Sequence, residues 1–197
     1  MSERSDAPGA LEQVRTFLNT WVVPNDTRAP VDTLPEIAAR RGAWQRAMPG
    51  VVPPQDGRNG ASVTALQDLR NDLRAVLGQA RPSGLTDRLR PLRWQLEVGS
   101  TSAEPVTLAG DPQTTETMLL AIVVRAIADG TWHRLRACPD CGWVFYDSSR
   151  NARRTWCSMG TSGGARGCGS IAKTRAYRAR KRAAAGAARA EEGPVAP

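Results

Sequence analysis

The sequence predicts an α+β fold that is mainly α: a helical N-terminal domain with a small β-hairpin, followed by a small cysteine-bearing module that ends in a basic helix. Three observations support this prediction. Several segments before residue 130 repeat apolar residues every three or four positions, as amphipathic helices do. One pair of short segments alternates apolar and polar residues, which is the pattern of a β-hairpin. All four cysteines lie between residues 138 and 168.

The first half of the chain carries three predicted helices. Residues 10–22 place their apolar residues along one helical face, and residues 62–80 carry the clearest stripe in the chain. Between them, a loop at residues 24–32 precedes a second helix, which should start at residues 32–33 and end near Met48. The next segment is rich in proline and glycine and is expected to be an exposed connection through residue 60.

A hairpin and a central helix complete the predicted N-terminal domain. Residues 93–98 and 106–108 alternate apolar and polar side chains and should pair as two strands. The Asp-Pro pair at residues 111–112 is expected to start a helix that stops at Gly130. Because residues 118–124 are apolar on all sides, we expect this helix at the centre of the domain.

The cysteines are spaced C-x2-C-x15-C-x10-C, at Cys138, Cys141, Cys157 and Cys168. Two thiolates three positions apart can face one metal ion, and four sulfur ligands are typical of structural zinc. The sequence therefore predicts a zinc-ribbon or treble-clef-like module with zinc as its cofactor. Two alternatives remain open: buried or redox-active thiols, and His133 in place of Cys168 as the fourth ligand.

The residues around the cysteines suit a small metal-dependent fold. Gly142 permits a tight turn, and residues 143–146 should form a short strand of bulky residues that covers the metal. Cys168 can join the site only if the glycine-rich residues 158–167 fold back on themselves. A module of this size with few aliphatic residues needs a metal before it folds. The expected limits are residues 1–136 for the helical domain, 137–184 for the zinc module and 185–197 for a disordered tail.

Positive charge is concentrated in the same part of the chain. Residues 1–137 have a net charge of +1, whereas residues 138–182 carry ten Arg and Lys residues against two Asp residues, a net charge of +8. A polyanion is the natural partner of such a segment, although a solvated face is the alternative. Residues 171–183 predict a helix with an alanine stripe turned toward the module and basic residues on both flanks. The predicted nucleic-acid contacts are Arg150, Arg153, Arg154, Lys173, Arg175, Arg178, Arg180, Lys181 and Arg182.

Three aromatic residues of the module also bear on this prediction. Trp143, Trp156 and Tyr177 could stack on bases. In a zinc module with few other hydrophobic residues, we expect them instead to shield the metal or to pack the helix.

The motif around the second cysteine carries a family resemblance. Residues 141–159, Cys-Gly-Trp-Val-Phe-Tyr-Asp-Ser-Ser-Arg-Asn-Ala-Arg-Arg-Thr-Trp-Cys-Ser-Met, with a downstream Cys-Gly and Ala-Lys-x-Arg-x-Tyr-Arg-x-Arg, resemble the CGNR zinc-finger family of bacterial proteins. The resemblance covers roughly the last third of the chain and implies the same four cysteine ligands. Two features depart from the family: Ser170 and Ile171 replace its Asn and Arg, and the spacing between the last two cysteines is six residues longer.

The same resemblance bears on the N-terminal domain. In the CGNR family a helical ABATE domain precedes the finger and is regarded as the stress-related or ligand-sensing part of transcription regulators. Residues 10–137 resemble it in helix order and in the fragment FLNTW at residues 17–21. The resemblance thus implies a signal-sensing domain joined to a zinc finger.

The residues and the resemblance together predict a zinc-dependent DNA-binding protein, a transcription regulator whose N-terminal domain binds a small-molecule signal or forms a homodimer. The alternative is a zinc-stabilised module that binds RNA or a protein. An enzyme is not expected, because the chain offers one histidine, no clustered carboxylates and no nucleotide-binding loop. With no secretory signal and no apolar run of about 20 residues, the expected location is the cytoplasm, in association with the nucleoid and not with a membrane.

Overall fold

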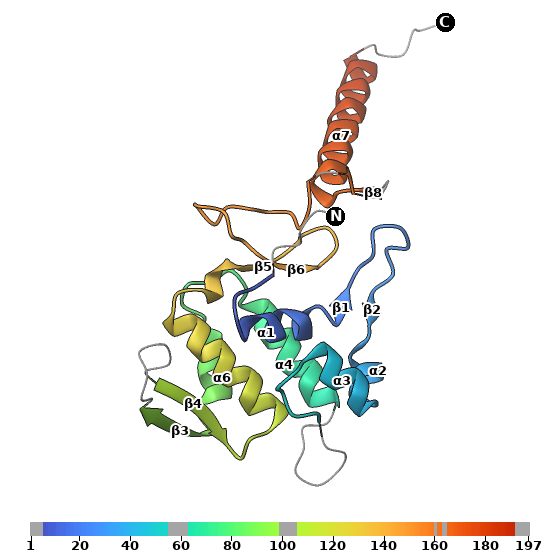
Figure 1. Cartoon of the computed structure of the whole chain (residues 1–197). Coiled ribbons are helices and arrows are strands. Elements are labelled where there is room, and N and C mark those ends of the chain that lie inside the picture. Colours follow the sequence, from blue (N-terminus) through green and yellow to red (C-terminus); the bar gives the residue numbers. More distant parts are fainter. Residues whose placement is uncertain (1–5, 55–62, 99–105, 160, 163–164, 192–197) are drawn as a thin grey trace, which may run out of the picture.

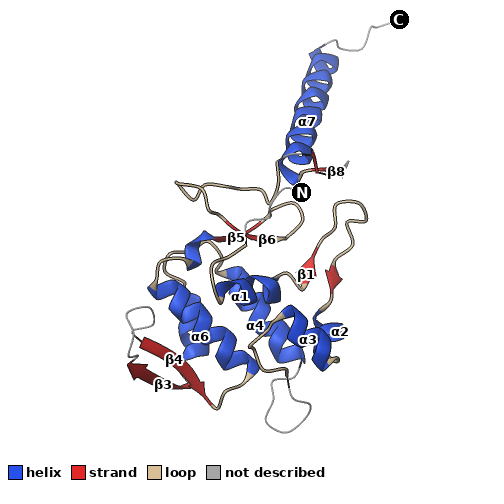
Figure 2. Ribbon diagram, viewed as in Figure 1, coloured by secondary structure: helices blue, strands red, loops and turns tan. Residues whose placement is uncertain are grey.

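The computed structural model describes residues 6–54, 63–98, 106–159, 161–162 and 165–191 (Figure 1). Within them the helices are α1 (Leu11–Leu18), α2 (Leu34–Ala38), α3 (Arg41–Ala47), α4 (Val63–Ala75), α5 (Thr86–Leu89), α6 (Thr115–Ala128) and α7 (Cys168–Glu191). The strands form four antiparallel pairs (Figure 2): β1 (Trp21–Val22) with β2 (Val31–Asp32), β3 (Arg93–Val98) with β4 (Val106–Asp111), β5 (Leu135–Ala137) with β6 (Val144–Tyr146), and β7 (Thr161–Ser162) with β8 (Ala165–Arg166). The predicted α+β, mainly α fold is confirmed.

The main core lies between α1 and α4, whose predicted apolar stripes supply buried residues, and α6, the helix predicted to be apolar on all sides. Its largest fully buried side chains include Phe17, Trp44 and Trp132. The indole Nε1 of Trp44 donates to the carbonyl of Val51 at 3.0 Å, and that of Trp132 to the carbonyl of Val76 at 3.3 Å. Both rings therefore add apolar area to the core without leaving a buried donor unsatisfied.

The second predicted helix is divided in the structure. Arg40 is extended, with φ −124° and ψ 103°, and separates α2 from α3. In one continuous helix Leu34 and Trp44 would point about 80° apart. The break lets both side chains become fully buried, which explains why one long helix does not form here.

Two further boundaries differ from the prediction. The first helix ends at Leu18, so Trp21 lies in β1 and not on the helix. The central helix begins at Thr115 and not at Asp111, which is the last residue of β4. Thr114 caps it instead: its hydroxyl accepts the Thr117 N–H at 3.1 Å, and the Thr117 hydroxyl accepts the Thr114 N–H at 2.8 Å. The predicted stop at Gly130, with φ +67°, is confirmed.

Residues 21–32, predicted as the end of a helix and a loop, form a projecting β1–β2 arm (Figure 1). A buried arginine anchors its base. The two Arg70 Nη atoms each donate to one oxygen of Asp32 at 2.7 Å, and Nη1 also donates to the Thr20 hydroxyl at 2.8 Å. The hydrogen bonds from Arg70 lower the pKa of Asp32 to about 2, so this pair is charged across the neutral range.

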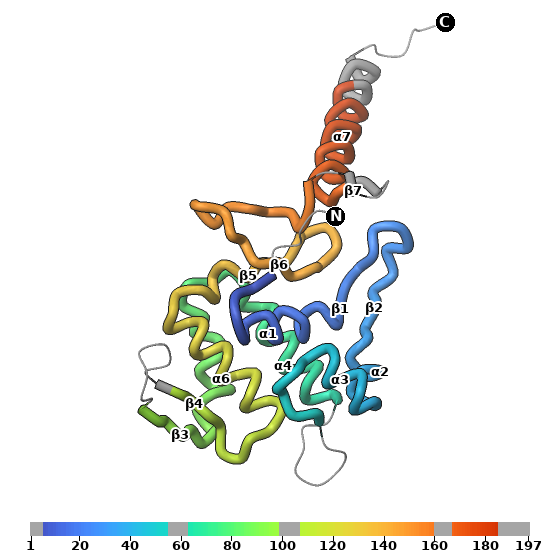
Figure 3. Tube along the Cα trace, in the orientation of Figure 1, coloured from blue at the N-terminus to red at the C-terminus, as the bar shows by residue number. Residues whose placement is uncertain are grey.

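Strand β6 joins the main core to a second, smaller one. Val144 is fully buried and belongs to the main core, whereas Phe145 is fully buried among the cysteines. Successive residues of a strand point to opposite faces, so one short strand serves both cores. The cysteine module is therefore packed on the helical domain along α1 and β6, as the tube in Figure 3 shows.

The last helix continues beyond the predicted end of the module. Its backbone is helical to Glu191, and residues 192–197 of the predicted tail lie outside the described residues. Among the helices of the described ranges, none combines the length and the apolar character needed to cross a membrane.

Candidate metal centre

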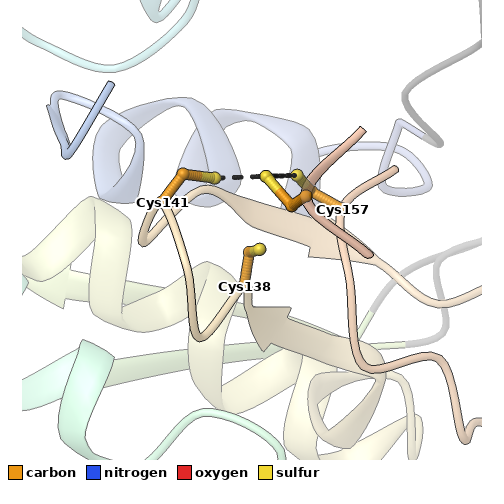
Figure 4. A group of neighbouring side chains, drawn as sticks. Cys138, Cys141 and Cys157 are labelled. Carbon is orange, nitrogen blue, oxygen red and sulfur yellow. Dashed lines mark hydrogen bonds between the residues drawn. The ribbon is translucent and has the colours of Figure 1, made fainter. Parts of the chain in front are cut away.

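The four cysteine sulfurs lie within 4.8 Å of one another. The Sγ atoms of Cys141 and Cys157 are 3.6 Å apart, and those of Cys157 and Cys168 are 3.5 Å apart. A tetrahedral zinc ion with Zn–S bonds of about 2.3 Å separates its sulfurs by about 3.8 Å. Figure 4 shows Cys141 and Cys157 facing each other, with Cys138 directed at them from the neighbouring strand. The donor set and its spacing therefore fit a structural zinc ion.

Each cysteine is held by a different local structure. Cys138 and Cys141 belong to a turn between β5 and β6, where the Gly142 N–H donates to the Cys138 carbonyl at 2.9 Å. Gly142 has φ +69°, and a Cβ atom there would lie 2.7 Å from the ring of Trp21. The predicted glycine turn is confirmed, and the close approach of Trp21 gives a second reason for glycine.

The other two ligands come from the loop after β6 and from α7. Cys168 is the first residue of α7, a 24-residue helix, so the last ligand is placed by the start of that helix. Residues 161–162 and 165–166 pair as β7 and β8, which folds the glycine-rich segment back as predicted. A turn that carries two ligands and a helix start that carries the last one make the module treble-clef-like. His133 is not part of the cysteine cluster found among the described residues.

Close packing of the sulfurs shifts the pKa values of the thiols. Hydrogen bonds from Cys141 and Cys157 lower the pKa of Cys138. The bond to the Cys138 sulfur raises the pKa of Cys141 to about 12, and bonds to Cys138 and Cys141 raise the pKa of Cys157. One thiolate thus disfavours further ionisation of its neighbours. A divalent cation removes this conflict, because it binds thiolates and displaces the protons.

The β1–β2 arm reaches the metal centre and contacts it directly. The side-chain amide of Asn25 donates to the Cys168 sulfur at 3.1 Å, and its oxygen accepts from Arg28 at 3.3 Å. The Val23 N–H donates to the Cys141 carbonyl at 2.8 Å. A hydrogen bond to a ligand sulfur orients that ligand and stabilises its negative charge. Asn25 is therefore a positioning residue of the metal centre.

Asp140, between the first two cysteines, ties three parts of the chain together. Its side chain is only 5% exposed, and its Oδ1 accepts from Arg28 of the arm at 3.3 Å and from Arg175 of α7 at 2.5 Å. Arg28 also donates to the Asp140 backbone carbonyl at 3.0 Å. The arm, the cysteine turn and the last helix are thus joined through one carboxylate.

Two residues of the helical domain fix the other side of the module. Asn19 brackets Val144: its Nδ2 donates to the Val144 carbonyl at 2.9 Å, and its Oδ1 accepts the Val144 N–H at 2.7 Å. Arg74 donates to the Gly142 carbonyl at 2.6 Å and lies over the ring of Trp21, 4.8 Å from its centroid. The metal centre is therefore built against α1 and α4 as well as the arm.

The loop between β6 and Cys157 is held by hydrogen bonds to a buried carboxylate. The Asp147 carboxylate is fully buried and accepts from the Ser149 N–H, the Ser149 hydroxyl and the Arg154 N–H. Burial raises the pKa of Asp147, but these hydrogen bonds outweigh it and hold the pKa below its usual value. The Arg154 guanidinium donates to the carbonyls of Trp156 and Cys157 and lies over the Phe145 ring.

The two positions that depart from the CGNR motif also have visible roles. The Ser170 hydroxyl donates to the Met159 carbonyl at 2.5 Å. This hydrogen bond joins the start of α7 to the segment that follows Cys157. Ile171 is half-buried. Gly169 lies against the Met159 side chain, so a larger residue there would need Met159 to move.

The predicted nucleic-acid contacts fall into two groups. Arg154 is half-buried and engaged within the module. Arg175 is exposed but bound to Asp140. The others are exposed and form no ion pair within the described residues; they are Arg150, Arg153, Lys173, Arg178, Arg180, Lys181 and Arg182.

The surface of α7 differs from the prediction. The alanine stripe was expected to face the module, yet Ala176, Ala179 and Ala183 are exposed, because α7 projects away from the body (Figure 1). Tyr177 is 60% exposed and does not pack the helix. Trp143 and Trp156 do pack against the cysteine cluster, as predicted. The described contacts between α7 and the module involve the start of the helix, from Cys168 to Arg175, and the side chains of residues 176–184 are exposed. Ala176, Ala179, Ala183 and Tyr177 therefore lie beyond the part of α7 that meets the module.

Sequence reasoning missed the residues that the arm supplies. Asn25 and Cys168 are 143 positions apart, and no spacing rule connects them. The one local signal was the Pro-Asn-Asp-Thr sequence at residues 24–27, which is typical of a turn and indicates nothing about a metal.

We expect Asn25→Ala to weaken zinc binding about tenfold, because loss of a hydrogen bond to a ligand commonly costs a factor of ten or more. Competition with a chromophoric chelator measures the affinity. Thr27→Ala on the same arm is the control and should leave zinc affinity unchanged. Equal zinc affinities for the unchanged protein, Asn25→Ala and Thr27→Ala would show that the Asn25 contact does not stabilise the metal centre.

Residues 134–181 match the model of the CGNR zinc finger. The matched segment begins one residue before β5, ends within α7 and contains all four cysteines. No curated protein matches the chain significantly. The last part of the chain is therefore a zinc-finger domain whose cysteines are placed for metal binding.

Proposed function

We propose that this chain is a DNA-binding transcription regulator in which the zinc finger presents α7 to DNA. The observation that carries the proposal is the exposed basic helix, which is attached near its start, through Cys168 and Arg175, and projects from the body (Figure 1). With 24 residues it is about 36 Å long, enough to extend along a DNA groove. Its position at a rigid metal centre fixes its direction relative to the helical domain.

The side chains of α7 suit a helix lying in the major groove. Arg178 and Arg182 lie on one flank, Lys173 and Arg180 lie on the other, and all four are exposed. The exposed alanines run along one side between these flanks and keep that side of the helix narrow. Close approach of a small-residue face to the base pairs would bring the basic flanks to the phosphates on either side.

A second basic patch lies on the loop of the zinc finger. Arg150 and Arg153 are exposed there and are available to further phosphates. We leave Arg154 and Arg175 out of the proposed surface, because their guanidinium groups bind the Cys157 region and Asp140 respectively. The proposed contacts are therefore Arg150, Arg153, Lys173, Arg178, Arg180, Lys181 and Arg182.

We assign zinc a structural and not a catalytic part. Four protein sulfurs complete a tetrahedral zinc shell and leave no position for a substrate. The helical domain then serves as the scaffold of the finger, and the sensing of a signal by that domain remains a proposal drawn from its resemblance to ABATE domains.

RNA is the second candidate partner, because the exposed ring of Tyr177 could stack on an unpaired base. This ring is 60% exposed on α7, close along the helix to Lys173 and Arg180, where a single-stranded base could stack on it. Double-stranded DNA offers no such unstacked base. The choice between the two partners therefore depends on a comparison of duplex and single-stranded ligands.

Fluorescence anisotropy with the intact zinc-loaded protein tests the proposal. We expect duplex DNA to bind more tightly than single-stranded RNA of equal length. For duplex DNA, the plot of log affinity against log salt concentration should have a slope of about −6, from the release of counterions by the seven basic residues. An affinity for duplex DNA that does not change with salt concentration, or no binding at low salt, would contradict the proposal. Preference for single-stranded RNA would favour the second candidate.

A further inference from the structure

The outer edge of β3 is a candidate interaction surface. β4 lies between β3 and α6, so β3 is the outermost strand of its hairpin (Figure 2). In the part of the chain that the structure describes, β3 pairs with β4 and with no other strand. Its second row of backbone N–H and C=O groups is therefore open to another strand.

Two of the five exposed large apolar side chains among the described residues lie on this strand, and the most exposed of the five is one of them. Leu96 is 67% exposed and Val98 is 85% exposed. They share one face of β3 with the half-buried Trp94, because alternate residues of a strand point the same way. Soluble proteins commonly protect an edge strand with proline, lysine or a bulge. β3, with the sequence RWQLEV, has no proline or lysine and pairs with β4 in continuous register. Its two charged residues, Arg93 and Glu97, are of opposite sign and so do not repel a second copy of the strand in every register.

The sequence of β3 is complementary to itself in the antiparallel direction. If two copies pair with Gln95 opposite Gln95, Arg93 of each copy lies opposite Glu97 of the other. On the other face Trp94 then lies opposite Leu96. Opposite charges and apolar pairs placed directly across an antiparallel ladder both stabilise it.

Only one register gives this match. A shift by two positions in either direction separates Arg93 from Glu97 and places each opposite an uncharged residue. A shift by one position would mix the polar and apolar faces of the two strands. The charged residues therefore define the pairing, and the apolar residues of the other face are compatible with it.

We propose that this chain forms a two-fold symmetric dimer in which β3 of one copy pairs antiparallel with β3 of a second copy. The two hairpins then make one four-stranded sheet in the order β4-β3-β3-β4, with the two-fold axis at Gln95. Such a contact is isologous, so it closes at two copies and does not propagate. The proposal concerns association alone and does not depend on DNA binding.

The dimer is expected to be weak. A six-residue edge is smaller than a standard interface, which buries about 800 Å² on each partner. A dissociation constant of about 10 µM is therefore reasonable for this contact. Sedimentation equilibrium of the full zinc-loaded chain, from about 1 to about 200 µM, covers both states. A monomer throughout this range would overturn the proposal.

Charge reversal tests the register. Glu97→Arg places two like-charged pairs across the dimer axis and should weaken association at least about tenfold. Adding Arg93→Glu to the same chain restores opposite charges and should restore the dimer. Because Arg93→Glu also faces Asp111 within the hairpin, the melting temperature of each variant is measured alongside. Failure of the double variant to recover, at an unchanged melting temperature, would rule out this pairing.

A cross-link tests the axis independently. Gln95→Cys places two cysteines opposite each other across the ladder, at a distance that a disulfide can span. Mild oxidation of the zinc-loaded protein should therefore give a covalent dimer. Thr107→Cys is the control, since Thr107 lies on β4 and is separated from the axis by β3. Equal cross-linking of both variants, or of neither, would overturn the proposal.

Discussion

Replacing Arg178, Arg180 and Arg182 with alanine should weaken DNA binding more than tenfold and make the salt slope less steep by about three. The physical reason is that each of these exposed side chains would neutralise one phosphate and release its counterion. None of them forms an ion pair within the described residues, so the folded protein should not need them. The measurement is anisotropy at several salt concentrations, with zinc content determined for each sample.

The control for this experiment removes the same charge elsewhere. Arg41, Arg46 and Arg90 are exposed on the helical domain, and their joint replacement by alanine gives the same net charge. If the basic surface is on α7, this control should keep nearly all of its affinity and its salt slope. Equal losses in the two triple variants would show that net charge alone, and not α7, attracts the DNA.

Removal of zinc should unfold the finger, which is the second large effect. Structural zinc contributes apparent binding free energies of about 10–16 kcal/mol in isolated finger peptides. The second core consists of Phe145 and the cysteines with two tryptophans, and is too small to persist without the metal. Trp143 and Trp156 report the change directly, so we expect a large shift in tryptophan fluorescence when a strong chelator is added, and its reversal when zinc is returned.

The helical domain should lose stability with the finger but remain folded. Val144 belongs to its core, and Asn19 and Arg74 bind the backbone of the finger. Hydrogen exchange should therefore show faster exchange in β5, β6 and the β1–β2 arm after chelation, with protection kept in α4 and α6. Cys168→Ser should reproduce this pattern, whereas Ser158→Ala should not. An unchanged exchange pattern in the chelated protein would mean that the finger folds without metal.

Acid should release the metal in the same way as a chelator. The pKa of Cys157 is raised, and that of Cys141 is raised to about 12, so protons compete strongly with zinc for these sulfurs. The metal holds the thiolate form at neutral pH, and each fall in pH favours the protonated thiols. This competition explains why chelation and acidification should give the same exchange pattern.

Much of the fold followed from local patterns in the sequence. The stripes of α1 and α4, the apolar run of α6, the β3–β4 hairpin and the stop at Gly130 are periodicities, runs and turn residues that act over a few positions. The four cysteines were found by spacing, because a metal needs ligands of one kind close together. The concentration of basic residues after Cys138 was equally visible, since charge can be counted without a structure.

The tertiary structure decided what those residues contact. Asn25 reaches Cys168 across 143 positions. Val144 enters a core that is built by α1 and α4, which lie far earlier in the chain, and by α6, which lies shortly before it. Arg175 and Arg178 look alike in the sequence, yet only Arg175 meets a carboxylate. Ala176, Ala179 and Ala183 of α7 are exposed because, within the described residues, they lie beyond the part of the helix that contacts the module. The sequence by itself predicted most helices from local periodicity, the candidate metal ligands from cysteine spacing and the charge from composition. The β1–β2 arm, the core shared through β6 and the exposed face of α7 depend on packing between segments far apart in the chain, which local patterns do not encode.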